Sequence, residues 1–192
     1  MTTTLEKPAK VAMNGVDVPT FVATLGVVKE QPEIAKFTFR ANGEWLSGNH
    51  SRTSVSNFFG VMAEQQHKDT FSVESDHPQV LGATGNGMTP PEMLLAALSA
   101  CITAGIGNIA SIRQVKLQSV ETTVEGDIDL VGLLGLDKSV RNGFSGIRAT
   151  FRIKGDAPAE DLEKIVQQSV ARSAVFDVIT NGVPVSVAAI AN

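Results

Sequence analysis

The twenty uncharged residues from Met93 to Ile112 constrain the fold of this chain more than any other feature. An apolar stretch of this length can cross a bilayer or form a long helix inside a protein core. The stretch contains Ser, Thr, Asn and Gly, and its flanks lack the belt of Trp, Tyr and Lys that anchors a membrane helix. We therefore predict a buried helix of a soluble domain and no membrane span.

The sequence indicates where this helix begins. Thr89-Pro90-Pro91-Glu92 combines a Thr-x-x-Glu capping box with proline in the first turn, so Thr89 is the expected N-cap. Gly105 and Gly107 each cost roughly 1 kcal/mol relative to alanine inside a helix, which suggests that close packing or function offsets them. The side chains expected on one face of the helix are Leu94, Ala97, Leu98, Cys101 and Ala104 or Gly105.

Composition excludes several classes of protein. Among 192 residues there is a single cysteine, Cys101, so no intrachain disulfide can form. The three histidines are too scattered for a zinc module. The formal net charge is −4, and no basic cluster offers a surface for a phosphate backbone, so nucleic acid is an unexpected partner. Met1 to Pro8 lacks the apolar core of a secretory signal, which predicts a cytoplasmic protein.

Before the central helix, the patterns predict one short helix and several strands. Helical spacing predicts a helix over Val18–Glu30. Period-two alternation then predicts a strand from Lys36 and a turn at Asn42-Gly43. Strands are also predicted over 44–59 and 71–74, broken at Ser47-Gly48-Asn49 and by the polar stretch 64–69. The glycines of Gly82–Met88 match no nucleotide-binding fingerprint and predict a flexible loop.

After the central helix, the same patterns predict strands and one further helix. The expected elements are a strand over 115–130 with a bulge near Ser119, a Gly-rich loop over 131–136, a strand over 147–154, a helix ending near Arg172, and a hairpin of 175–180 and 183–189 around Asn181-Gly182. This order of elements is typical of an α+β fold, and it differs from the regular alternation of a doubly wound sheet.

From the residues alone, the candidate site has ordinary explanations. A lone cysteine on an apolar helix face is usually a small buried hydrophobe, and a reactive thiol needs a cation or hydrogen-bond donors from elsewhere in the fold. Glu92 is explained by the capping box. Arg52 and His50 point to the same face of a predicted strand, which makes them a candidate pair.

The segment from Thr89 to Cys101, with Pro90, Leu94, Ala97 and Cys101 at matching positions, resembles the cysteine-bearing helix of the OsmC/Ohr family, the osmotically inducible and organic hydroperoxide resistance proteins. The order of the later pieces is similar to the family as well: Val124–Asp127, Phe151–Gly155 leading into Pro158–Leu162, Arg172–Asp177 and Val183–Val185. The resemblance implies an OsmC-like domain over residues 36–192, preceded by an N-terminal extension with a short helix over residues 1–35.

The resemblance also implies an architecture and an activity. We expect an OsmC-like α+β fold in which two central helices are wrapped by antiparallel sheets in an intertwined homodimer. Cys101 matches the family's peroxidatic cysteine, which attacks an organic hydroperoxide while an arginine and a glutamate activate it. Arg52 is the match for the arginine, with Arg40 as the fallback. The family's glutamate falls on Pro91, which leaves Glu92, one residue later, as the candidate.

One departure from the family pattern bears on the mechanism. Ser173 stands where the family has its resolving cysteine, so an external thiol must reduce oxidised Cys101. The expected protein binds no cofactor or metal. Two functions stay open: a thiol-dependent peroxidase acting on organic hydroperoxides in oxidative stress defence, or a non-catalytic dimer that binds a small hydrophobic ligand at the subunit interface. The first expectation rests on Cys101, and the second on the changes at Pro91 and Ser173.

Overall fold

The structure is a computed structural model that describes residues 10–191. These residues divide into two compact units, one that includes residues 10–16 and 95–191 and the other built from residues 17–94. Residues 1–8, which carry the prediction that a secretory signal is missing, lie outside the described residues. Helices and antiparallel sheets are combined in the α+β class that the sequence predicts.

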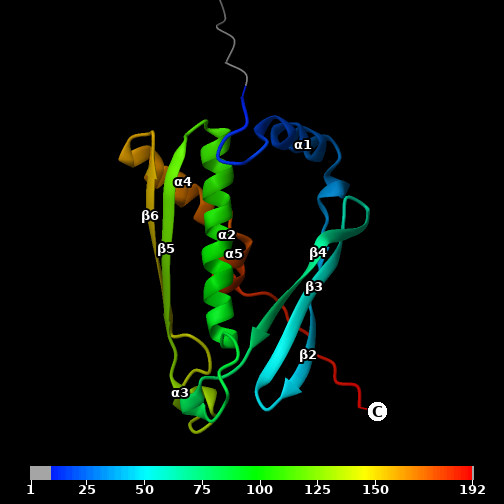
Figure 1. The fold of residues 1–192 in the computed structure, drawn as a ribbon, viewed down its shortest axis with the longest axis vertical. Coiled ribbons are helices and arrows are strands. Elements are labelled where there is room, and N and C mark those ends of the chain that lie inside the picture. The colour runs from blue at the N-terminus through cyan, green and yellow to red at the C-terminus, as the bar shows by residue number, and fades with distance from the viewer. Residues whose placement is uncertain (1–9, 192) are drawn as a thin grey trace, which may run out of the picture. The chain divides into compact units, whose positions relative to one another are not determined.

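The first unit is organised around α2 (Pro90–Ile112), the helix predicted from the uncharged stretch. A hairpin of β5 (Leu117–Asp127) and β6 (Gly146–Gly155) runs alongside α2 (Figure 1), and α4 (Ala159–Val170) packs against α2. The two strands pair antiparallel, and their register shifts between Leu117 and Ser119, which confirms the predicted bulge. The loop between the strands contains a short helix, α3 (Leu130–Leu133), within the stretch predicted to be a Gly-rich loop.

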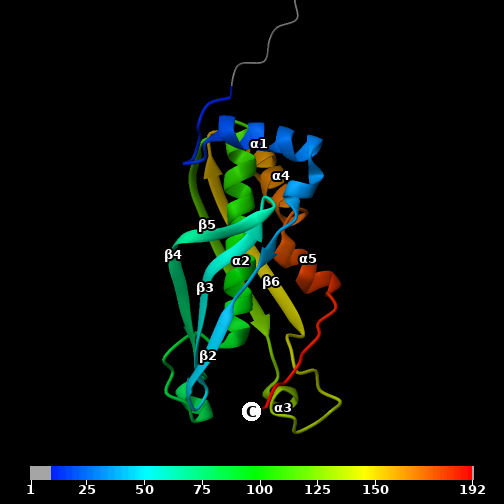
Figure 2. The same ribbon diagram turned by 90° about the vertical axis from the view of Figure 1, so that its right-hand side faces the viewer.

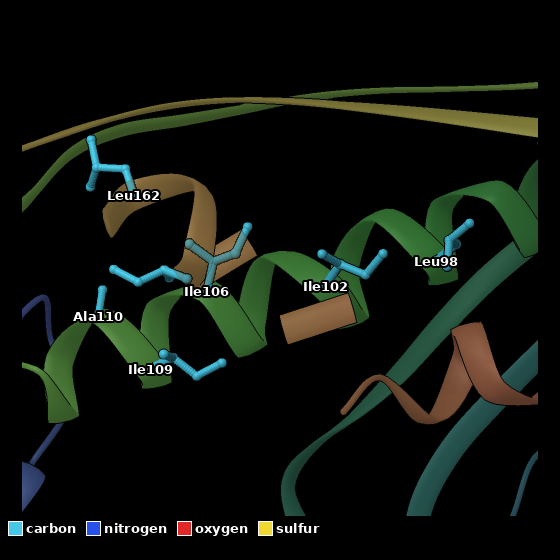
Figure 3. Close-up of a cluster of buried hydrophobic side chains, with 7 residues drawn as sticks. Leu98, Ile102, Ile106, Ile109, Ala110 and Leu162 are labelled. Atoms are coloured by element: carbon cyan, nitrogen blue, oxygen red, sulfur yellow. The ribbon is translucent and has the colours of Figure 1, made fainter. Parts of the chain in front are cut away.

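The core of this unit forms where one face of α2 meets α4. Figure 3 shows branched apolar side chains gathered along this face. The buried cluster consists of Leu98, Ile102, Ile106, Ile109 and Ala110 from α2 with Leu162 and Ile165 from α4. Half-buried apolar side chains of both strands and of the chain after α4 pack around this cluster. By length and composition α2 is also able to cross a membrane, but this face is buried within the protein.

Gly105 lets α4 approach α2 closely. A Cβ atom at this position would lie 2.2 Å from the Ser169 Oγ and 3.2 Å from the Ser169 Cβ. Ser169 is buried, and its hydroxyl donates a hydrogen bond of 2.6 Å to the Ile102 carbonyl. The packing explanation predicted for this glycine is therefore confirmed, whereas a Cβ at Gly107 would meet no atom within 4 Å.

Gly105→Ala is expected to lower the free energy of unfolding by about 1–3 kcal/mol, because the new methyl group must displace the Ser169 hydroxyl from its bond to Ile102. Chemical denaturation followed by circular dichroism measures this change. Gly26→Ala is the matched control, since a Cβ at this helical glycine meets open space. The control should be neutral or stabilising by up to about 1 kcal/mol. Equal effects of the two substitutions would contradict the packing argument.

The end of the chain differs from its prediction. Residues 175–180 are not a strand but lie in α5 (Ala174–Asn181). Ser173 caps this helix, since its Oγ accepts a hydrogen bond of 3.1 Å from the Phe176 N–H. Val175 and Ile179, four residues apart, both pack against the core, so the β-branched run follows a helical period. Residues 183–189, predicted as the last strand, form no strand within the described part of the chain.

The second unit begins with α1 (Val18–Glu30), which has the predicted bounds. Asp17 caps it by accepting a hydrogen bond from the Thr20 N–H. A four-stranded antiparallel sheet follows, in which β3 (His50–Gly60) pairs with β1 and β2 along one edge and with β4 along the other. The remaining elements are the 3-10 helix η1 (Pro32–Ala35), β1 (Thr38–Phe39), β2 (Asn42–Ser47), β4 (Ala63–Ser75) and the 3-10 helix η2 (Gln79–Leu81).

Two predictions about this sheet are wrong. Asn42-Gly43 does not form a turn but begins β2. The tight turn lies at Gly48-Asn49, where Ser47 pairs with His50, which confirms the predicted break at Ser47-Gly48-Asn49. The polar stretch 64–69 is not a break but lies inside β4. The register of β4 shifts where Val55 pairs with Phe71 and Asn57 pairs with Gln66, and the strand bends along its length (Figure 2). An irregular strand with polar faces does not give the alternation on which the prediction relied.

Asp76 fixes the loop over residues 82–88, which was predicted to be flexible. This carboxylate is buried and accepts hydrogen bonds from the Thr84 hydroxyl at 2.7 Å and from the backbone N–H groups of Asn86 and His77 at 3.0 and 2.8 Å. The hydrogen bonds, led by those of Asn86 and Thr84, lower the pKa of Asp76 from 3.8 to about 2. A single acidic side chain thus positions the loop that leads into α2.

Asp76→Asn is expected to lower the melting temperature at neutral pH, because the amide replaces a charged acceptor of three hydrogen bonds. The folded-state pKa is depressed, so the stabilisation is present above the ordinary carboxyl value of 3.8 and is lost as the pH falls from there through about 2. The difference in melting temperature should therefore shrink over this range. Asp69→Asn, at an exposed position, is the control. A difference that stays constant with pH would contradict the assignment.

Candidate active site

Cys101 lies in the middle of α2, next to the N-terminus of α5. Its side chain is half-buried. The Ser173 hydroxyl donates a hydrogen bond to the Cys101 Sγ over 3.1 Å. The tertiary fold therefore brings together Cys101 and Ser173, to which the resemblance assigns the resolving position, although 72 positions separate them in sequence.

The surroundings of the sulfur favour the thiolate. Burial raises the pKa of the Cys101 thiol, but hydrogen bonds from the Ser173 hydroxyl and from the backbone N–H groups of Val175 and Ala174 lower it, and the resulting pKa lies below the ordinary value. All three donors belong to the first turn of α5 or its cap. The partial positive charge of a helix N-terminus acts in the same direction. These donors come from elsewhere in the fold, as a reactive thiol in a helix without nearby charges requires.

Ser173 is held firmly in this position. The side chain is 5% exposed, and its N–H donates a hydrogen bond to the Val170 carbonyl at the end of α4. Its Oγ accepts from the Phe176 N–H while its hydroxyl hydrogen is directed to the Cys101 sulfur. From the sequence, Ser173 was predicted only as the loss of a cysteine, and its role as a hydrogen-bond donor was not predicted. A serine just before a helix is a typical N-cap and can be recognised from the sequence. Only the fold shows that this serine also faces the Cys101 sulfur.

Arg52 lies on β3 in the second unit, where it forms an ion pair with Glu74. The Arg52 Nε and Nη2 donate to the Glu74 Oε1 at 3.0 and 2.7 Å, and His50 contacts the other carboxylate oxygen. The predicted sharing of one strand face by His50 and Arg52 is confirmed. Hydrogen bonding to Glu74 raises the pKa of Arg52 and lowers that of Glu74. The role of Arg52 in activating the Cys101 thiol stays a prediction.

The fallback arginine and the candidate glutamate also have defined partners. Arg40 forms a bidentate ion pair with Glu64, in which its Nη1 and Nη2 donate to the Glu64 Oε2 and Oε1 at 2.8 and 2.9 Å. Glu92 accepts hydrogen bonds of 2.8 Å from both the Thr89 N–H and hydroxyl, and its own N–H donates to the Thr89 Oγ1. These bonds lower the pKa of Glu92 and confirm the capping box. A catalytic role for Glu92 stays a prediction.

Across residues 10–191, no group of three or more His, Cys, Asp or Glu side chains is arranged to hold a metal ion. The groups available for chemistry at Cys101 are its thiol, the Ser173 hydroxyl beside it and the backbone donors of α5. A thiolate stabilised in this way is a nucleophile toward an electrophilic oxygen or sulfur atom.

Comparison with known families identifies the domain. The model of the family described as OsmC-like protein matches residues 83–188, which is more than half of the chain and includes α2, Cys101 and Ser173. No curated protein matches the sequence significantly.

Solved structures share the fold at low sequence identity. An OsmC-like protein from Mycoplasma pneumoniae is 12% identical, with a TM-score of 0.57, over 74% of this chain and 86% of that one. An osmotic stress induced and detoxification response protein from Psychrobacter arcticus is 14% identical, with a TM-score of 0.54, over 74% and 88%. An organic hydroperoxide resistance protein from Legionella pneumophila is 16% identical, with a TM-score of 0.50, over 75% and 91%. The predicted OsmC-like fold is thus confirmed.

Proposed function

Because the chain belongs to the OsmC-like family, we propose that it is a thiol-dependent peroxidase that reduces organic hydroperoxides through Cys101 in oxidative stress defence. The observation that carries the proposal is the set of donors around the Cys101 sulfur, which lowers the pKa of the thiol. The structural neighbour from Legionella pneumophila is named an organic hydroperoxide resistance protein, which supports this substrate class. A lone buried cysteine without chemistry needs no such donors, so the geometry favours catalysis over simple ligand binding.

The first step consumes one hydroperoxide. The Cys101 thiolate attacks the terminal oxygen of ROOH, an S–O bond forms, the O–O bond breaks, and the alkoxide takes a proton to leave as ROH. Cys101 is oxidised to the sulfenic acid, and the peroxide is reduced to the alcohol. The donors of Ser173, Ala174 and Val175 lower the pKa of the Cys101 thiol and so favour the thiolate that starts this step.

The second step needs two external thiols, because Ser173 cannot form a disulfide. The first thiol displaces water from the sulfenic acid to give a mixed disulfide, and the second releases Cys101 as a thiol with formation of a free disulfide. We therefore propose that the protein acts without a bound cofactor. A thiol-rich compartment such as the cytoplasm supplies such reductants, and we place the protein there.

The experiment treats the reduced protein with one equivalent of cumene hydroperoxide in the presence of dimedone, a reagent that captures sulfenic acids. Mass spectrometry of the Cys101 peptide is expected to show the dimedone adduct, with one cumyl alcohol formed per adduct. An unmodified peptide and unconsumed hydroperoxide would overturn the proposal.

We also propose that the active protein is a homodimer. The exposed face of α2 carries Ala96, Ala97, Ala100 and Ala104, small residues that let a second helix approach closely. The segment after α5 is extended and alternates Val183, Val185 and Val187, and the last two are 81% and 90% exposed. A second copy would bury both features. Sedimentation equilibrium is expected to give twice the chain mass of 20.3 kDa, whereas a monomer would contradict this assembly.

A further inference from the structure

The α5 side of the Cys101 sulfur is closed by a side chain that cannot move aside easily. The Ser173 Oγ lies 3.1 Å from the Cys101 Sγ, and Ser173 is 5% exposed. Its hydroxyl donates to the sulfur and its oxygen accepts from the Phe176 N–H, so two hydrogen bonds hold it. Hydrogen bonding from the Val175 and Ala174 N–H groups, in the first turn of α5, also lowers the pKa of the thiol. A hydroperoxide must therefore reach this half-buried sulfur from the side away from α5.

The direction of this approach determines where the next reactant must arrive. The oxygen delivered by the hydroperoxide is bonded to sulfur on the side away from α5. A thiol that displaces this oxygen attacks the sulfur nearly in line with the S–O bond, from the opposite side. That position is occupied by the Ser173 Oγ. The buried Ser173 hydroxyl thus occupies the position from which an external thiol would have to attack the Cys101 sulfur.

The same groups that stabilise the thiolate also stabilise its oxidised form. The Ser173 hydroxyl and the two N–H groups remain donors toward the sulfur of a sulfenate, which carries a negative charge in its ionised state. Nothing in this arrangement supplies a thiol, because Cys101 is the single cysteine of the chain. Formation of the sulfenic acid is favoured, and its removal is obstructed.

We propose that Ser173 is a positioning residue that makes the Cys101 sulfenic acid long-lived. Cys101 then stays oxidised after exposure to a hydroperoxide and returns only slowly to the thiol. This inference rests on the proposed oxidation of Cys101 and adds how that site is regulated. The slow step is the displacement of water from Cys101–SOH by a low-molecular-weight thiol R′SH, which forms Cys101–S–S–R′ and releases H2O.

The test compares the wild type with Ser173→Gly, because glycine at an N-cap costs only a few tenths of a kcal/mol relative to serine and the helix should persist. Each protein is oxidised with one equivalent of cumene hydroperoxide, and glutathione is added. Stopping samples with dimedone gives the rate of sulfenic acid loss. Removal of the Ser173 side chain is expected to slow oxidation of Cys101 but to speed loss of the sulfenic acid at least about tenfold.

These opposite changes separate a positioning role from general damage to the fold. Ser173→Thr, which keeps the hydroxyl, should retain the slow loss seen in the wild type. Ser99→Ala, which removes a hydroxyl bonded to Thr122 elsewhere on α2, should change neither rate. Equal rates of sulfenic acid loss in the wild type and Ser173→Gly would overturn the inference while leaving the peroxidase proposal intact. Failure of the wild type to form any sulfenic acid would overturn both.

Discussion

Cys101→Ser is expected to slow the consumption of the first equivalent of cumene hydroperoxide by roughly 100-fold or more, to the rate without protein. A serine hydroxyl does not ionise near neutral pH, so the donors of α5 have no anion to stabilise. The substitution changes one atom in a half-buried side chain, so the fold should be retained. Peroxide consumption is measured by a colorimetric assay at equal protein concentrations.

Ser99→Ala serves as the matched control for this prediction. Ser99 lies two residues from Cys101 on α2, and its hydroxyl is bonded to the Thr122 hydroxyl at 2.6 Å. The control removes a hydrogen bond from the same helix without touching the sulfur, and it should keep the activity of the wild type. Undiminished consumption by Cys101→Ser would show that the sulfur plays no part in the reaction.

Ser173→Cys is expected to convert the oxidised protein almost completely into a form with an intrachain disulfide to Cys101. The present Oγ–Sγ distance of 3.1 Å exceeds an S–S bond by about 1 Å, a gap that the longer C–S bond and small rotations can close. The introduced thiol would also stand in line behind the S–O bond of the sulfenic acid. One equivalent of hydroperoxide should therefore produce the disulfide at the expense of the dimedone adduct.

Peptide mapping under non-reducing conditions detects this disulfide as a cross-linked peptide that contains positions 101 and 173. The double variant Cys101→Ser, Ser173→Cys is the control, and it should yield no such peptide. Persistence of the sulfenic acid in Ser173→Cys, with no cross-link, would mean that position 173 does not face the reacting side of the sulfur.

Local signals made most of the fold predictable. The bounds of α1, the capping box at Thr89 and the bulge near Ser119 each depend on residues close together in sequence, and all are confirmed. The resemblance of the segment around Cys101 led to the OsmC-like family, which the family model confirms. These features need no knowledge of distant contacts.

Features that depend on tertiary contacts were harder to predict from the sequence. The β-branched residues of 175–180 suggested a strand, because only the packed core shows that Val175 and Ile179 face one direction in a helix. The polar residues of β4 gave no alternation, yet pairing with β3 carries the strand through them. The donors around the Cys101 sulfur come from a helix 72 residues away, which no spacing in the sequence reveals.

The most direct test of the central claim, that Cys101 is an activated thiolate which reacts with hydroperoxides, is the pH dependence of its oxidation. Stopped-flow mixing of the reduced protein with cumene hydroperoxide gives the second-order rate constant between about pH 4 and 10. We expect a rate constant well above that of free cysteine and a titration midpoint below the ordinary value of a cysteine thiol, because the pKa of Cys101 is lowered. A rate constant equal to that of free cysteine, with a midpoint at or above that value, would contradict it.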